Sequence, residues 1–166
     1  MKIHKNFLNK EKFKEIQNIL TSGEFPWYLN SIVDFGSDNK KVKFNHQMCH
    51  VMYTNNVVNS NFYHTVKPVY EKIKWFSLLR IKANLIMRSE KIIEHSMHTD
   101  FDEKKYKIHT GILYVNTNNG YTKFSNGEIV KSEENKYVEF DSQLEHTGSS
   151  CTDEEYRIVI NFNYIK

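Results

Sequence analysis

The sequence has few cysteines, and this scarcity excludes a domain built on disulfide bonds. Of the 166 residues only Cys49 and Cys151 are cysteines, and no Cys-x-x-Cys pair occurs. Two distant cysteines cannot form the framework of a small secreted domain, so we expect a reduced, cytoplasmic setting. Residues 1–14 are charged and lack an apolar core, which predicts no signal peptide. No apolar run approaches the length of a membrane span, so we expect no membrane partner.

A dense charge of one sign is also missing. The formal net charge is +3 and the sequence pI is about 8.7, and the lysines are scattered among glutamates instead of forming a stripe. Scattered charges of this kind are typical of a solvated surface, whereas nucleic-acid-binding proteins gather lysine and arginine into a patch. Nucleic acid is therefore not an expected partner.

The chain is rich in aromatic residues, which make up 14% of it, and its length predicts one domain over residues 1–166. We expect residues 1–75 to form a helical and irregular support. Asn9 caps a predicted helix over residues 10–22, in which Phe13, Ile16 and Leu20 share one face. A second helix is predicted over residues 61–74, although Pro68 lies inside it.

The pattern changes at residue 76, from which we expect a barrel core that carries the metal site. Turn-rich pieces at residues 116–120 and 125–127 separate apolar or branched runs, and these runs cover residues 78–87, 111–115, 136–140 and 157–164. Short strands divided by turns are typical of an all-β barrel or jelly roll. The predicted fold class is therefore mainly β, with supporting α-helices.

His98, Asp100 and His146 have the residue types of a 2-His-1-carboxylate triad, which holds non-haem Fe(II) and leaves metal positions open. Residues two apart on a strand point to the same face, so His98 and Asp100 can reach one ion. A His-x-Asp pattern alone is a common coincidence, and the downstream histidine is what gives it weight. His95 and His98 also form a His-x-x-His pair, but nothing in the sequence completes a closed zinc site with them.

Arg157 follows the second histidine at the start of a strongly apolar run. A guanidinium binds carboxylates through two parallel hydrogen bonds, so this position indicates a co-substrate that carries a carboxylate. Surface arginine is the alternative interpretation, but residues 158–160 are typical of a central strand.

The second half of the chain resembles the Fe(II)/2-oxoglutarate-dependent dioxygenases, in particular their prolyl 4-hydroxylase-like branch. The resemblance covers about half of the chain and follows the family's order of motifs, namely His98-Thr99-Asp100, Gly111-Ile112-Leu113-Tyr114-Val115-Asn116, Gly120-Tyr121-Thr122-Lys123-Phe124, Tyr137-Val138-Glu139-Phe140-Asp141, His146-Thr147-Gly148 and Arg157-Ile158-Val159-Ile160-Asn161.

This resemblance implies a double-stranded β-helix (a cupin-like jelly roll) with Fe(II) on His98, Asp100 and His146. It implies 2-oxoglutarate as co-substrate, with its far carboxylate on Arg157 and on the hydroxyl of Tyr114; a core aromatic residue is the alternative interpretation of Tyr114. By strand parity Thr110 shares the inward face of Tyr114. The implied activity is like that of procollagen-proline 4-dioxygenase, with O2 as oxidant, ascorbate as reductant, and succinate and CO2 as co-products.

The substrate remains open between several classes. The family likeness favours a prolyl residue in a peptide or protein, and a free amino acid or other small molecule is the near alternative. A nucleic-acid demethylase of the same superfamily usually has a second arginine six positions after the first, where this chain has Asn163. A non-catalytic cupin-like protein that binds a metal or ligand is the alternative from another class.

Several polar residues are candidates for the substrate side of the pocket. Asn161 and Asn163 share the strand parity of Arg157, and a run that leads to the triad offers Arg80, Lys82, Asn84 and Arg88 as residues of an entrance. The polar segment of residues 34–45 is a candidate lid.

Overall fold

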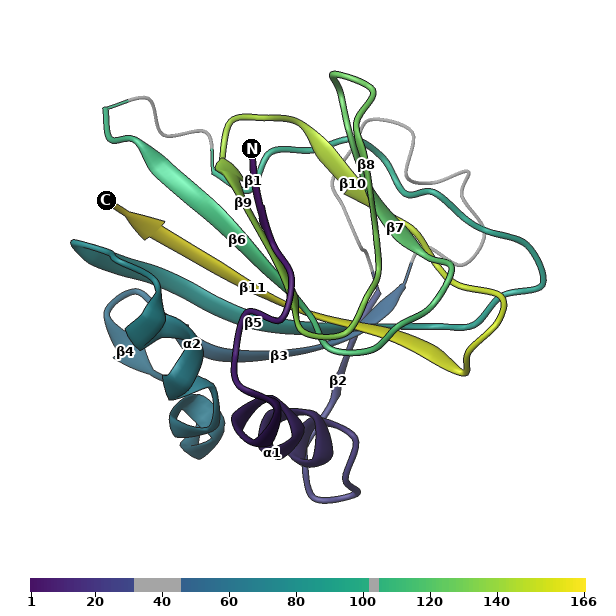
Figure 1. Ribbon diagram of the computed structural model, residues 1–166, viewed down its shortest axis with the longest axis horizontal. Coiled ribbons are helices and arrows are strands. Elements are labelled where there is room, and N and C mark those ends of the chain that lie inside the picture. The colour runs from purple at the N-terminus through teal and green to yellow at the C-terminus, as the bar shows by residue number, and fades with distance from the viewer. Residues whose placement is uncertain (32–45, 102–104) are drawn as a thin grey trace.

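The computed structural model describes residues 1–31, 46–101 and 105–166, and its strands are antiparallel and form two sheets (Figure 1). The candidate lid of residues 34–45 lies outside the described residues. Among the described residues, no helix is long and apolar enough to cross a membrane. The mainly β architecture with a few helices agrees with the sequence-based expectation.

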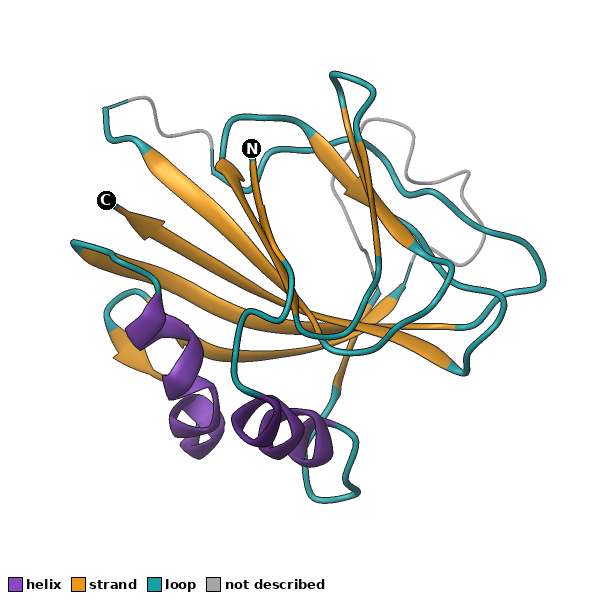
Figure 2. Cartoon of the chain, in the orientation of Figure 1, coloured by secondary structure: helices purple, strands orange, loops and turns teal. Residues whose placement is uncertain are grey.

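The larger sheet contains eight strands among the described residues. In spatial order they are β1 (Lys2–His4), β9 (Lys136–Asp141), β6 (Ile108–Tyr114), β11 (Tyr156–Ile165), β5 (Ser77–Met87), β3 (Gln47–Thr54) and β2 (Tyr28–Asn30), and β4 (Val57–Val58) pairs with β3. The smaller sheet consists of β10 (His146–Gly148), β7 (Tyr121–Phe124) and β8 (Ile129–Lys131). Helices and the smaller sheet lie on opposite sides of the larger sheet (Figure 2).

The first predicted helix is confirmed as α1 (Lys10–Leu20). Its cap is Asn9, whose side-chain oxygen accepts a hydrogen bond of 2.9 Å from the backbone N–H of Lys12. This bond satisfies one of the N–H groups that a helix start leaves without a partner. Phe13, Ile16 and Leu20 are buried against the large sheet, as their spacing predicted.

The second predicted helix is wrong as a single element. A 3-10 helix, η1 (Asn61–Val66), is followed by α2 (Lys67–Lys72), and Pro68 lies in the first turn of α2. Proline has no N–H to donate to the preceding turn, so it is tolerated in the first turn of a helix but not in its interior. The chain therefore starts a new helix at Lys67 instead of continuing the old one.

The expectation of a purely helical and irregular support over residues 1–75 is incomplete. That part of the chain also supplies β1, β2, β3 and β4, and β3 lies directly beside the long strand β5. Short strands are stabilised mainly by side-chain pairs with their neighbours, and β3 pairs with a strand that comes some thirty residues later. The sequence around β3 therefore gives no indication of the strand with which it pairs.

Alternating residues of the central strands supply two separate apolar clusters. On β11, Ile158, Ile160 and Phe162 face the helices, whereas Val159 belongs to a second cluster between the two sheets. This second cluster contains Ile112, Tyr114, Phe124, Val130, Val138, Phe140 and Val159. Arg157, Asn161 and Asn163 share the parity of Val159, so these polar residues face the inside of the sandwich.

Candidate active site

The predicted metal ligands come together between the two sheets. His98 lies in the irregular segment after β5 and forms an isolated antiparallel bridge with His146 of β10, with N–H···O distances of 3.0 and 2.9 Å. The expected strand around His98 is thus reduced to one bridged residue, but the extended backbone still brings Asp100 to the same point. One ligand atom from each of the three residues lies within 4.8 Å of the others.

Both imidazoles are oriented by backbone carbonyl groups. Nδ1 of His98 lies 3.2 Å from the carbonyl oxygen of Ser96, and Nδ1 of His146 lies 3.1 Å from that of Leu144. An N–H donated at Nδ1 leaves the lone pair of Nε2 available for a metal ion. Burial lowers the pKa of His146, partly opposed by the charge of Asp100, which favours the neutral, ligating form.

The carboxylate of Asp100 is held by three side chains. Oδ1 accepts a hydrogen bond of 2.8 Å from Nη2 of Arg80. Oδ2 accepts hydrogen bonds of 2.7 Å from Thr110 and 3.0 Å from Asn163. Burial by itself would raise the pKa of Asp100, but Arg80, His146 and these hydrogen bonds outweigh it and the pKa lies below its ordinary value. The group is therefore an ionised ligand at neutral pH.

Thr110 and Asn163 lie at a different point of the site from the one that the sequence suggested. We expected Thr110 near the co-substrate and Asn163 near the substrate. In the structure both are fully buried, and the amide of Asn163 bonds Thr110 at 2.9 Å and Arg80 at 2.9 Å. Strand parity predicted their direction correctly, but their position along the strands places them against Asp100.

The three ligands fit an Fe(II) ion. Two neutral imidazole nitrogens and one carboxylate oxygen are the donors of the facial triad, and among the described residues no fourth histidine, cysteine or carboxylate joins this group. Such a set leaves coordination positions for a co-substrate and for oxygen.

A cavity of about 550 Å³ extends from the triad between the sheets. Its walls come from β2, β3, β5, β6, β7, β10 and β11 and from the segment around His98; the lining residues are Asn30, Gln47, Arg80, Lys82, Asn84, Ile86, Met97, His98, Thr99, Asp100, Ile112, Thr122, Glu145, His146, Gly148, Arg157, Val159 and Asn161. Asn84 and Asn161 therefore border the cavity as predicted, whereas Asn163 does not.

Arg157 lies at the other end of this cavity and is only 3% exposed. Its Nε donates a hydrogen bond of 2.7 Å to Ser132, and its Nη2 donates one of 3.1 Å to Thr122. The same Thr122 hydroxyl accepts a hydrogen bond of 2.8 Å from Tyr114, whose ring centroid is 5.6 Å from the guanidinium carbon. Tyr114 thus lies beside Arg157, with its hydroxyl on Thr122, and it is not among the residues that line the cavity.

The buried guanidinium has no carboxylate partner among the described residues. Burial lowers the pKa of Arg157 and raises that of Tyr114, because both charged forms lose water. A buried cation is costly unless an anion compensates it. The phenol stays protonated and donates to Thr122. This end of the cavity is therefore suited to a carboxylate group of a ligand.

Sequence reasoning missed the two hydroxyl residues around Arg157. Thr122 lies on β7 and Ser132 follows β8, and no local pattern distinguishes such residues from ordinary surface threonine and serine. Arg80, in contrast, could be predicted from the sequence, because polar residues alternate along β5. The same alternation places Lys82 and Asn84 in the cavity lining.

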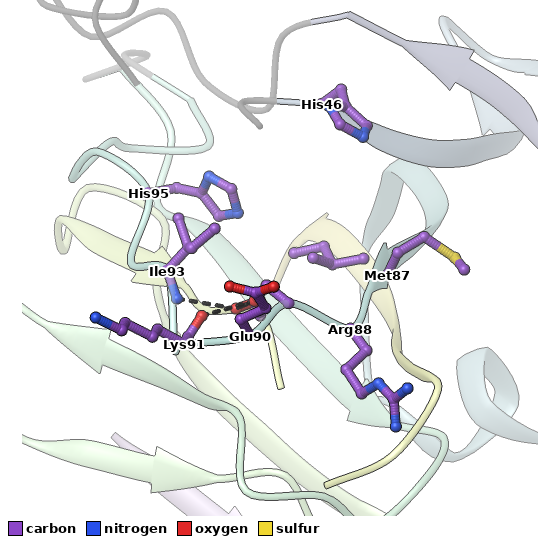
Figure 3. A pocket seen from close by; sticks show the side chains of 10 residues that line it. His46, Met87, Arg88, Glu90, Lys91, Ile93 and His95 are labelled. Atoms are coloured by element: carbon purple, nitrogen blue, oxygen red, sulfur yellow. Dashed lines mark hydrogen bonds between the residues drawn. The ribbon is translucent and has the colours of Figure 1, made fainter. Parts of the chain in front are cut away.

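A second cavity of about 470 Å³ lies beyond the end of β5 (Figure 3). His46 and His95 border it from different segments, together with Ile86, Met87, Arg88, Ser89, Glu90, Lys91, Ile93 and Ser150. The hydroxyl of Ser150 accepts the backbone N–H of Ile93 at 2.9 Å and contacts the hydroxyl of Ser89 at 2.6 Å. Arg88 thus belongs to this cavity instead of the entrance to the triad, and His95 is not part of the metal group.

No family model and no curated protein matches the chain. Solved structures do match it. A prolyl hydroxylase from Trichoplax adhaerens, in complex with a hypoxia-inducible-factor peptide fragment, has a TM-score of 0.65 at 14% identity over 99% of this chain and 82% of that one. A prolyl-4-hydroxylase from Pseudomonas putida has a TM-score of 0.61 at 12% identity over 99% and 91%.

The chain has the fold of the 2-oxoglutarate- and Fe(II)-dependent oxygenases. The predicted double-stranded β-helix is thereby confirmed. Proteins with this fold catalyse more than one kind of reaction. The α-ketoglutarate-dependent epimerase SnoN from nogalamycin biosynthesis also has a TM-score of 0.65, at 10% identity over 99% of this chain and 76% of that one. Activity must therefore be argued from the side chains of the cavity.

Proposed function

We propose that the protein is an Fe(II)- and 2-oxoglutarate-dependent oxygenase. One observation carries the proposal, namely that a single cavity joins the His98, Asp100 and His146 group to the buried, carboxylate-free guanidinium of Arg157. When bound, Fe(II) would supply the activation of O2, coupled to conversion of 2-oxoglutarate into succinate and CO2, for oxidation of a C–H bond.

The residues of the chain divide this work between them. Arg157 and Tyr114 bind the far carboxylate of 2-oxoglutarate, and Thr122 holds both donors in place. Ile112 and Val159 lie between the two ends and offer apolar walls to the methylene groups of the co-substrate. Thr110 and Asn163 orient the carboxylate of Asp100 toward the metal. Outer-shell contacts of this kind set the direction of metal ligands.

We further propose a prolyl residue in a peptide or protein as the substrate, with ascorbate as the reductant. The structural similarity to two proteins named prolyl hydroxylases supports this, and one of those structures contains a peptide. A free amino acid is the second candidate, favoured by the cationic Lys82 and the polar Asn84 and Asn161 in the cavity wall.

The test is conversion of 2-oxoglutarate to succinate by the protein with Fe(II), ascorbate and air. Prolyl peptides and free amino acids are added in parallel, and mass spectrometry searches for products heavier by one oxygen atom. We expect succinate in air and none under nitrogen. Absence of succinate with every compound and without any would contradict the proposal and favour a cupin-like binding protein.

A further inference from the structure

Among the described residues that line the cavity, the positive side chains outnumber the carboxylates. Arg80, Lys82 and Arg157 line it, against the carboxylates of Asp100 and Glu145. Fe(II) and the 2-oxoglutarate dianion carry equal and opposite charges, so loading the site with both leaves this excess unchanged. The proposed metal and co-substrate therefore do not neutralise the cavity.

The excess charge lies on Lys82. Arg80 is paired with Asp100 at 2.8 Å, and Arg157 is the binding group for the co-substrate carboxylate. Among the described residues, no carboxylate lies within ion-pair distance of the Lys82 ammonium and no hydrogen-bond acceptor reaches it. Burial lowers the pKa of Lys82, and the charges of Cys49 and Asp100 oppose this shift.

The strand registers place Lys82 between the two ends of the cavity. Its cross-strand partner on β11 is Asn161, which in turn lies opposite Ile112 of β6. The row on one side of it contains Arg80, Asn163 and Thr110, which hold Asp100, and the row on the other side contains Asn84 and Val159. Lys82 thus lies beside the space that the metal and co-substrate would share, where a substrate must be bound.

Two carboxamides next to Lys82 also lack partners. The side-chain oxygens of Asn84 and Asn161 are buried, and no described group donates to either of them. Both residues line the same cavity. Asn161 is the cross-strand neighbour of Lys82, and Asn84 lies two positions after Lys82 on β5. Buried polar atoms are almost always hydrogen-bonded in the functional state, so these oxygens indicate a ligand with N–H or O–H donors.

We propose that the substrate presents a carboxylate to Lys82, and that Asn84 and Asn161 receive hydrogen-bond donors from the same molecule. This inference rests on the proposed function and specifies its substrate. The carboxylate can be that of a free amino acid or an acidic side chain beside a prolyl residue. An ammonium and two amide oxygens together match the carboxylate and amine of an amino acid.

Matched acid and amide pairs test the proposal. The binding of L-proline and L-prolinamide is compared by calorimetry under nitrogen, with Fe(II) and 2-oxoglutarate present, and the other free amino acids and their amides follow. Capped peptides Pro-Glu and Pro-Gln form the second arm. We expect at least one acid to bind about tenfold or more tightly than its amide, since a hydrogen bond between charged groups is lost in the amide.

Three variants assign that preference to Lys82. In Lys82→Met we expect the ratio of acid to amide affinity to fall to within twofold of one, whereas Lys82→Arg retains a preference. Lys131→Met, at an exposed lysine of β8, is the matched control and should keep the wild-type ratio. A preference among the free amino acids would identify the substrate as a free amino acid, and a preference for Pro-Glu over Pro-Gln would identify it as an acidic peptide.

Equal binding of acid and amide throughout the panel would overturn the proposal, as would a preference that survives in Lys82→Met. Weaker binding of 2-oxoglutarate in Lys82→Met, with the substrate preference unchanged, would assign the lysine to the co-substrate and also overturn it. A preference that depends on Lys82 in a protein that never forms succinate would instead refute the oxygenase proposal and leave the binding assignment standing.

Discussion

The two ends of the cavity contain buried charges of opposite sign, and the protein compensates these charges differently. At one end the carboxylate of Asp100 is surrounded by a guanidinium, an amide and a hydroxyl, all from the protein. At the other end the guanidinium of Arg157 has only hydroxyl partners in Ser132 and Thr122. The first end is complete without a ligand, except for the metal that it orients, whereas the second carries a charge that a ligand must compensate.

This difference teaches how a binding site can be recognised without its ligand. A buried charge that the protein itself satisfies is positioned for a task, and a buried charge with only neutral partners indicates the sign of what binds there. The contrast supports the proposal of a metal at the Asp100 end and of a co-substrate carboxylate at the Arg157 end. Three predictions test it, from the largest expected effect to the smallest, and a fourth concerns the stability of the fold outside the cavity.

The largest effect is expected from His146→Ala. This change removes one of three metal ligands, so we expect loss of stoichiometric Fe(II) and of succinate formation, measured by metal analysis and product assay. His64→Ala, at an exposed histidine, is the matched control. A folded His146→Ala protein with normal turnover, as judged by circular dichroism and assay, would eliminate the triad.

Arg157→Ala tests the other end. We expect the 2-oxoglutarate requirement to rise by about 2–4 kcal/mol, which is roughly 30- to 900-fold in concentration, because the anion loses its buried partner. Arg157→Lys should recover part of this loss, since it restores the charge without the two-pronged geometry. Titration of 2-oxoglutarate in the succinate assay measures both variants. An unchanged 2-oxoglutarate requirement in Arg157→Ala would show that another residue binds the carboxylate.

Two buried threonines allow the ends to be separated with the same small change. Thr110→Val removes a donor to Asp100, and we expect roughly 10- to 100-fold weaker metal binding with a smaller effect on 2-oxoglutarate. Thr122→Val removes the acceptor of Arg157 and Tyr114, and we expect the reverse, at a cost of about 1–3 kcal/mol in 2-oxoglutarate binding. Metal and co-substrate titrations that gave the same pattern for both variants would refute the division of the cavity.

The smallest effect concerns the far face of the large sheet, where Glu139 accepts hydrogen bonds of 2.7 Å from Tyr164 and from Lys166. Burial by itself raises the pKa of Glu139, but these partners bring it below the ordinary value of 4.5. A carboxylate with a lowered pKa stabilises the fold above that value, and this contribution is lost as the pH falls below it.

Glu139→Gln should therefore flatten the decline of stability in acid and leave the cavity unaffected. Urea midpoints measured between about pH 6 and pH 3 compare the variant with the wild type. We expect the two curves to converge at the acid end, and parallel curves would show that Glu139 does not carry this dependence.

Much of the fold was predictable because its strands have strong local patterns. The β5 and β11 runs were apparent from branched and aromatic residues, and α1 from its cap and apolar face. The strand β3 was not predicted, because its pairing with β5 joins segments that are distant in sequence and leaves no local pattern. Pro68 indicated an interruption of the second predicted helix. The form of that interruption, a change from a 3-10 helix to an α-helix, was not predictable from the local sequence.

The sequence by itself determined the chemistry of this site. It named His98, Asp100, His146 and Arg157, because metal ligands and charged groups are specific residue types, and the family resemblance added Tyr114. Only the tertiary structure decided which neighbours complete them. Thr110 and Asn163 were placed on Asp100 and Thr122 on Arg157 by the register between strands that are distant in sequence. Register sets the position along a strand, and it is determined by side-chain packing across the whole sheet.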